Sequence, residues 1–142
     1  MTVYTDGAWR PLLHIGAYAY CIKTQKNKKI QNGGIIRGES LNADIAEFSA
    51  FIKAIQFLVQ KKMLNDRNLK NTVNVYTDSL RLTIVYEQGC IFPASKRLCW
   101  KIREIKRRYG HLINIHWAPR NSIEEQKACD LFCKKLIKKY EQ

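Results

Sequence analysis

One short stretch occurs twice and decides the fold: Val3-Tyr4-Thr5-Asp6 and Val75-Tyr76-Thr77-Asp78. Each copy is a run of β-prone residues that ends in an aspartate, which predicts a strand with an acid at its carboxyl end. The copies are too short to indicate a repeat architecture. Because helical patterns separate the two stretches, we expect their strands to be parallel, joined by right-handed crossovers. The sequence therefore predicts two aspartates at one edge of a sheet.

The remaining patterns surround these two strands with three more strands and four helices. The expected strands cover residues 2–5, 15–22, 29–37, 72–77 and 111–117, and the expected helices cover residues 42–62, 79–88, 95–109 and 123–140. The polar stretch 24–28 predicts a hairpin between the second and third strands. We expect an α/β fold in which residues 1–142 form one domain, with a mixed five-stranded sheet and helices on both faces.

The charge of the chain indicates its partner. It carries 25 Lys and Arg against 12 Asp and Glu, a net charge of +13. Such an excess favours a polyanion through counterion release, whereas a basic surface that only aids solubility is the alternative. The cations concentrate on two amphipathic helical patterns, one over residues 96–108 and one over residues 134–139.

Other features exclude several classes of protein. No apolar run approaches the roughly 20 residues of a membrane span, and residues 1–6 lack the basic and apolar regions of a secretory signal. The five cysteines include no CxxC pair, so we expect neither a zinc tetrad nor a disulfide framework. These features predict a cytoplasmic protein with no membrane partner.

Each strand-end aspartate also has a simpler explanation. Asp6-Gly7 could form only a turn, and Asp78 could serve only as the N-cap of a helix that begins near Ser79. In an open α/β sheet, however, ligands bind outside the carboxyl ends of the strands. If their strands are parallel neighbours, Asp6 and Asp78 lie at such a binding edge.

Two helical acids add to this pair. Glu47 lies in the row of Phe51, on the flank of an apolar stripe, and Asp130 lies beside the row of Cys133. A carboxylate at the edge of a core usually has a cation or a function; for either residue alone, a salt-bridged acid is the alternative. If all four carboxylates meet, they require bound cations, and their hard oxygen ligands select Mg²⁺ or Mn²⁺.

The motifs around these acids resemble type 1 ribonuclease H over nearly the full length of the chain. The similar segments are Tyr4-Thr5-Asp6-Gly7 with Gly16-Ala17-Tyr18-Ala19, then Ala46-Glu47-Phe48, Tyr76-Thr77-Asp78-Ser79, and Ala128-Cys129-Asp130-Leu131. They occur in the family's order and on the expected elements. The resemblance implies the ribonuclease H-like fold and places Asp6, Glu47, Asp78 and Asp130 at the positions of the family's metal-binding quartet.

The resemblance also implies a reaction. With two Mg²⁺ ions, or Mn²⁺ in their place, water would attack the RNA strand of an RNA–DNA hybrid and leave 5′-phosphate and 3′-hydroxyl ends. Asp6 and Asp78 would contact the ions most directly, with Asp6 bridging both. Glu47 would bind one ion and the ribose 2′-hydroxyl, and Asp130 would hold the second ion. The protein would act as a monomer.

The sequence departs from the family pattern at several places that concern the nucleic acid, including Leu80, where a glutamine is usual. Arg120 occupies the loop position where the family commonly carries a histidine, so it is a candidate phosphate contact, or only a surface cation. The segment between Tyr86 and Ser95 is too short for the basic handle of some members. Binding would then depend more on the next helix, where the candidate contacts are Lys96, Arg97 and Lys101.

Two other functions compete with this hypothesis. One is another nuclease of the same superfamily, which the match to the type 1 motifs disfavours. The other is a catalytically silent module that binds nucleic acid, because the loop histidine is absent. Retention of all four acids disfavours the silent module, since a binder gains nothing from acids that face phosphates.

Overall fold

The computed structural model describes residues 1–38, 41–65 and 72–141. Its centre is a five-stranded sheet with the strand order β3-β2-β1-β4-β5. The strands are β1 (Thr2–Arg10), β2 (Ile15–Lys23), β3 (Lys29–Arg37), β4 (Val73–Thr77) and β5 (Ile113–Trp117). The pairs β1–β2 and β2–β3 are antiparallel, whereas β1–β4 and β4–β5 are parallel. The predicted mixed sheet is confirmed.

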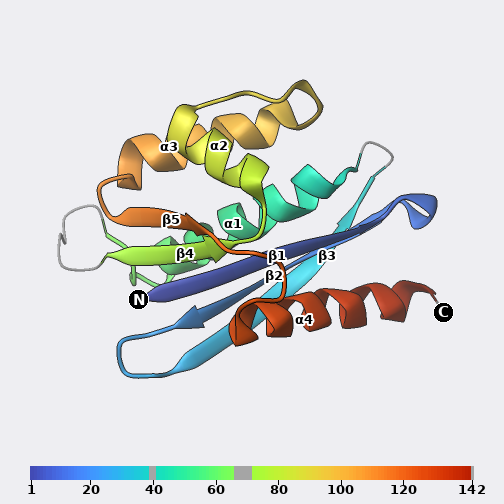
Figure 1. Cartoon of the computed structure of the whole chain (residues 1–142), viewed down its shortest axis with the longest axis horizontal. Helices are drawn as coiled ribbons and strands as arrows, with labels where there is room; N and C mark the ends of the chain where they lie inside the picture. Colours follow the sequence, from blue (N-terminus) through green and yellow to red (C-terminus); the bar gives the residue numbers. More distant parts are fainter. Residues whose placement is uncertain (39–40, 66–71, 142) are drawn as a thin grey trace.

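Four helices cover the two faces of this sheet. Three of them, α1 (Ala43–Gln60), α2 (Leu80–Gln88) and α3 (Lys96–Tyr109), lie on one face. The fourth, α4 (Glu124–Glu141), lies on the opposite face and packs against β1, β2 and β3 (Figure 1). The prediction of helices on both faces is therefore confirmed.

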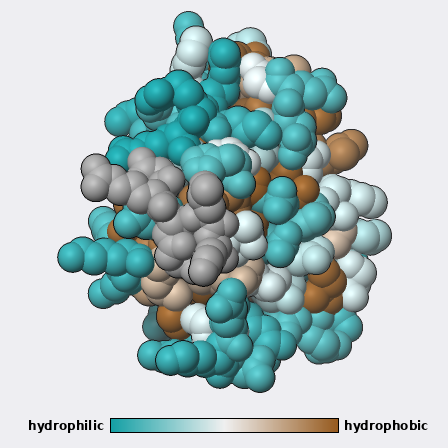
Figure 2. Space-filling model, turned by 90° about the vertical axis from the view of Figure 1, so that its left-hand side faces the viewer, coloured by the Kyte–Doolittle hydropathy of each residue, from teal (hydrophilic) through white to brown (hydrophobic). Residues whose placement is uncertain are grey.

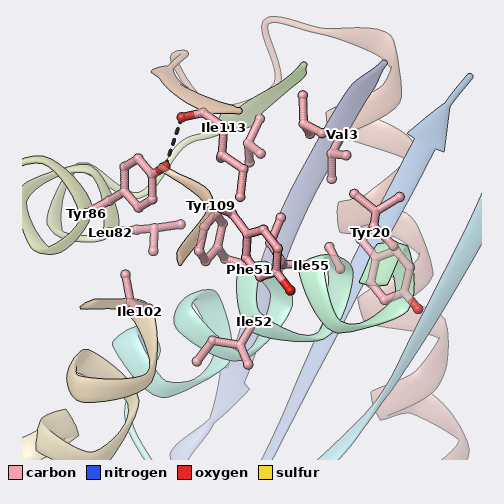
Figure 3. Packing of buried hydrophobic residues seen from close by; sticks show 14 of the residues in the cluster. Val3, Tyr20, Phe51, Ile52, Ile55, Leu82, Tyr86, Ile102, Tyr109 and Ile113 are labelled. Atoms are coloured by element: carbon pink, nitrogen blue, oxygen red, sulfur yellow. Dashed lines mark hydrogen bonds between the residues drawn. The ribbon is translucent and has the colours of Figure 1, made fainter. Parts of the chain in front are cut away.

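Each face has its own hydrophobic cluster, as the alternation of strand side chains requires. The larger cluster packs Val3 and Ile113 of the sheet against the three helices (Figure 3), and it also contains Val75. There the Tyr86 hydroxyl donates a hydrogen bond to the Ile113 carbonyl at 2.8 Å. The smaller cluster lies under α4; its buried members are Ile15, Ala17, Ala19, Cys21, Cys129, Cys133 and Ile137.

The first strand is longer than predicted, and the prediction of a turn at Asp6-Gly7 is wrong. β1 continues to Arg10 because its pairing with β2 continues, with Gly7 opposite Tyr18. Gly7 serves a different purpose here: a Cβ atom at this position would lie 2.5 Å from the Ala46 carbonyl carbon. The missing side chain lets α1 lie directly against β1, next to Asp6.

Helix ends follow the capping signals of the sequence. The Asn42 side chain accepts a hydrogen bond from the Ile45 N–H at 2.9 Å and caps α1. Ser79 caps α2 by accepting from the Leu82 N–H at 3.1 Å. A role for Asp78 as only the cap of α2 is therefore wrong, and its carboxylate is available for another purpose.

The end of the sheet where β1, β4 and β5 begin faces the viewer in Figure 2. Its described surface is mostly hydrophilic, with scattered hydrophobic side chains. Within the described ranges, none of the helices combines the length and apolarity needed to cross a membrane.

Candidate active site

Three carboxylates meet where β4 ends beside β1. β1 pairs with β4 only from Thr2 to Tyr4, so Asp6 lies just beyond the last parallel pair and Asp78 just beyond the end of β4. Glu47, on the second turn of α1, reaches the same place. One oxygen from each of these three acids lies within 4.8 Å of the others. The predicted convergence is confirmed for Asp6, Glu47 and Asp78.

Burial and mutual repulsion make this cluster unfavourable for negative charge. Asp6 is 6% exposed, and its burial, together with the charges of Asp78 and Asp130, raises its pKa to about 7. The pKa of Glu47 is well above its usual value, because of burial and the charges of Asp6 and Asp78. Burial also raises the pKa of Asp78, although the nearby charge of Arg120 opposes the rise.

Hydrogen bonds satisfy only some of the carboxylate oxygens in this cluster. The Gly7 N–H donates to Asp6 Oδ1 at 2.9 Å. Among the described residues, the buried Glu47 Oε2 has no hydrogen-bond partner. A buried oxygen without a partner, in a group of mutually repelling carboxylates, is costly. Hard divalent cations such as Mg²⁺ and Mn²⁺ prefer such oxygen donors, so the residues at this place fit a divalent cation.

The fourth acid lies at the rim of the site. Asp130, on α4, lines the same pocket of about 290 Å³ as the other three acids. Its carboxylate is paired with cations: Lys134 Nζ lies 2.9 Å from Oδ2, and an Arg120 nitrogen lies 3.8 Å from Oδ1. Asp130 therefore shares the pocket without joining the tight cluster of three.

The candidate nucleic-acid contacts occupy two different regions. Arg120 lines the acidic pocket, as its loop position suggested. Lys96, Arg97 and Lys101 are exposed on α3. None of these three is among the described residues that line the pocket. Their contact with nucleic acid stays a prediction.

The sequence did not predict several residues that line the pocket, among them Trp9, Arg10 and Lys134. Lys134 follows Asp130 by one helical turn, and an i,i+4 spacing places two side chains on the same helix face. This spacing was visible in the sequence, but Lys134 also belonged to a run of surface lysines. His116, the histidine nearest to the loop, lies on β5 with its Nε2 3.0 Å from Asn74 Oδ1.

Fold and site together define a class of protein: an α/β enzyme with an acidic site, suited to divalent cations, at the carboxyl end of parallel strands. A family model described as RNase H matches residues 1–131. The chain belongs to the RNase H family and is thus a ribonuclease H enzyme. A search of curated proteins found no match.

Solved structures show the same fold. LC11-RNase H1, isolated from compost by a metagenomic approach, is 21% identical with a TM-score of 0.79; the match covers 99% of this chain and 97% of that one. LC11-RNase H1 in complex with an RNA/DNA hybrid is 23% identical with a TM-score of 0.78 and 99% coverage of both chains. RNase H1 from the halophilic archaeon Halobacterium salinarum is 16% identical with a TM-score of 0.75, and 97% of each chain is covered.

Proposed function

We propose that this ribonuclease H hydrolyses the RNA strand of RNA–DNA hybrids with two Mg²⁺ ions, or Mn²⁺ in their place, and leaves 5′-phosphate and 3′-hydroxyl ends. The observation that carries the proposal is the cluster of Asp6, Glu47 and Asp78, whose oxygens lie within 4.8 Å of one another. Membership of the family supports it. The hybrid bound to LC11-RNase H1, a protein of the same fold, supports the choice of substrate.

The four acids would hold the ions. Asp6, Glu47 and Asp78 would provide most of the ligands, and Asp130 would complete the set from the rim. Bound divalent cations supply a more acidic water for the attack and neutralise charge on the phosphate and the leaving oxygen. Asp6 would be the central ligand, as the resemblance of the motifs to the family implies.

Basic residues would bind the polyanion around this site. Arg120 is 69% exposed and lies beside Asp130 at the rim, so it would contact a phosphate close to the bond that is cut. Lys96, Arg97 and Lys101 would bind the hybrid backbone along the exposed side of α3 through salt-dependent contacts. One chain provides all four acids, so we propose that the monomer is active.

A silent binding module is a poorer explanation of this pocket. The buried Glu47 Oε2, which has no hydrogen-bond partner in the described part of the chain, and the repulsion among the three acids destabilise the folded chain. A protein that only binds phosphates would gain from losing these acids. A cation-dependent nuclease needs these acids to hold its cations, and this need explains why the chain keeps them although they destabilise the fold.

The test uses an RNA–DNA hybrid labelled on one strand or the other, incubated with the protein in Mg²⁺, in Mn²⁺ or in chelator. We expect cutting of the RNA strand only, in either metal, and no cutting in chelator. Asp78→Asn is expected to remove the activity while circular dichroism shows the same fold. Tight binding without cutting would favour the silent module, and cutting of DNA would favour another nuclease of the superfamily.

A further inference from the structure

Lys134 is a charged side chain of the acidic pocket to which the proposed reaction gives no role. Its ammonium group lies 2.9 Å from Asp130 Oδ2, while Arg120 approaches the other oxygen of the same carboxylate at 3.8 Å. The Asp130 side chain is 13% exposed, whereas those of Lys134 and Arg120 are 51% and 69% exposed. A nearly buried carboxylate is thus held by two cations that reach it from solvent.

This arrangement differs from the rest of the acid set. Asp6, Glu47 and Asp78 face one another, and their repulsion is not balanced by any cation in direct contact among the described residues. Asp130 is near enough for its charge to act on Asp6, yet its two oxygens are paired with cations of the protein itself. A divalent cation that binds Asp130 must compete with these two side chains.

We propose that Lys134 and Arg120 occupy Asp130 as exchangeable cations, so that a divalent ion gains this carboxylate only when the two side chains release it. Phosphates of the substrate would drive the release by attracting both side chains, a step that rests on the proposed function. Metal binding at Asp130 and binding of nucleic acid would then favour each other, because linkage between two sites is reciprocal.

The physical basis is competition for one carboxylate. Lysine is a compact charge on a flexible stem, and an arginine fork binds phosphate well. Since both side chains are more than half exposed, each can turn from Asp130 toward a phosphate at small cost. An ordinary i,i+4 ion pair would behave differently: it would add slightly to the stability of α4 and leave metal affinity unchanged.

The first test measures Mn²⁺ binding to the full chain without nucleic acid, through loss of the electron paramagnetic resonance signal of free Mn²⁺. Lys134→Met is expected to bind Mn²⁺ about five- to tenfold more tightly, the scale of one nearby charge. Lys138→Met removes an exposed lysine one turn further along α4 and serves as the control for net charge. We expect it to change the affinity less than about twofold.

The gain must also depend on Asp130. In an Asp130→Asn background, Lys134→Met is expected to leave Mn²⁺ affinity unchanged, which isolates the pair by a double-mutant cycle. Three outcomes would each overturn the exchange. Lys134→Met could leave Mn²⁺ affinity unchanged, it could raise the affinity no more than Lys138→Met does, or it could still raise the affinity in the absence of the Asp130 carboxylate. Thermal unfolding in chelator verifies that every variant folds, and Lys134→Gln provides a second neutral variant.

The second test adds a hybrid of 2′-O-methyl RNA with DNA, which lacks the free 2′-hydroxyl, to the same titration. We expect it to tighten Mn²⁺ binding of the unmodified chain more than that of Lys134→Met, in which one competitor is already absent. Equal tightening of both would overturn release by the substrate. Failure of the hybrid to bind would count against the proposed function and the release together, while the titration without nucleic acid still decides the exchange.

Discussion

The acidic pocket has two ends that treat negative charge in opposite ways. At the deep end, Asp6 is buried and Glu47 is partly buried among carboxylates, and the buried Glu47 Oε2 has no hydrogen-bond partner among the described residues. At the rim, Asp130 is paired with Lys134 and Arg120. The backbone of β1 and α1 fixes the deep end, whereas long side chains balance the rim. The difference shows that one pocket can combine a cluster of acids suited to an external cation with an acid that is already paired with cations of the protein.

The largest effect is expected from a substitution at the deep end of the pocket. Glu47→Gln keeps the shape of the side chain and removes its charge, so the three-acid cluster loses a ligand and part of its repulsion. We expect RNA cleavage to fall roughly 10³-fold. In chelator at pH 8, we expect the free energy of unfolding to rise by about 1–2 kcal/mol.

Cleavage assays and urea unfolding measure these two changes. The control is Glu104→Gln, which alters an exposed acid paired with Arg107 on α3. We expect it to leave both quantities unchanged. If Glu47→Gln were less stable than the unmodified chain in chelator, the carboxylates of the deep end would be stable without a cation. The difference in charge balance between the deep end and the rim would then disappear.

The second prediction concerns pH in the absence of metal. A raised pKa means that the folded state binds a proton more tightly than the unfolded chain does, so this contribution to stability is complete below pH 4 and is lost as the pH rises toward the folded value. For Asp6 that value is about 7, and Glu47 and Asp78 shift in the same direction. We expect the chain in chelator to be less stable at pH 8 than at pH 5, by on the order of 3 kcal/mol.

Urea unfolding at the two pH values tests this dependence. Mg²⁺ is expected to restore stability at pH 8 and to have little effect at pH 5, because protons then occupy the same oxygens. Asp6→Asn should flatten the pH dependence. A chain that gains stability between pH 5 and pH 8 in chelator would contradict the description of the deep end.

Much of the fold followed from the sequence because it depends on local patterns. The period of apolar residues set the helices close to their observed bounds, although the cap of α2 is Ser79 and not the predicted candidate Asp78. The end of β1 was missed, since Gly7 has the local signature of a turn. Its actual reason, the close approach of the α1 backbone at Ala46, is a contact between segments distant in sequence.

The site was predictable to a similar extent. Motifs identified all four acids, and the structure brings Asp6, Glu47 and Asp78 together. The pairing of Asp130 with Lys134 was not predicted, although the i,i+4 spacing was present. Spacing puts the two side chains on one helix face, but packing against the sheet decides which lysine of the run reaches an acid and which remains in solvent.

The third prediction concerns Arg120, at the rim of the pocket. Arg120→Ala removes a cation that lines the pocket and opposes the rise in the pKa of Asp78. We expect turnover to fall about three- to tenfold, the scale of one phosphate contact, while Mn²⁺ binding is retained or becomes tighter, because one competitor for Asp130 is absent. Steady-state kinetics with separate kcat and KM values measure the change. Unchanged turnover would mean that Arg120 is only a surface cation with no role in the reaction.

The smallest expected effect compares the two ends directly. Asp130→Asn removes an acid from the rim, as Glu47→Gln does from the deep end, but here two opposing changes occur. The variant loses the ion pair with Lys134, worth a few tenths of a kcal/mol on a partly exposed helix, and it relieves the repulsion that Asp130 exerts on Asp6. In chelator at pH 8, we expect the free energy of unfolding to change by less than about 0.5 kcal/mol.

Urea unfolding of both variants in one buffer makes this comparison, with Lys134→Met as the matched removal of the partner. A loss of more than about 1.5 kcal/mol for Asp130→Asn would mean that the rim pair holds α4 on the sheet. The expected near-zero change would mean that Asp130 is neutralised at little energetic cost. Its carboxylate is then free to exchange a cation of the protein for one from solution, which the buried acids at the deep end cannot do.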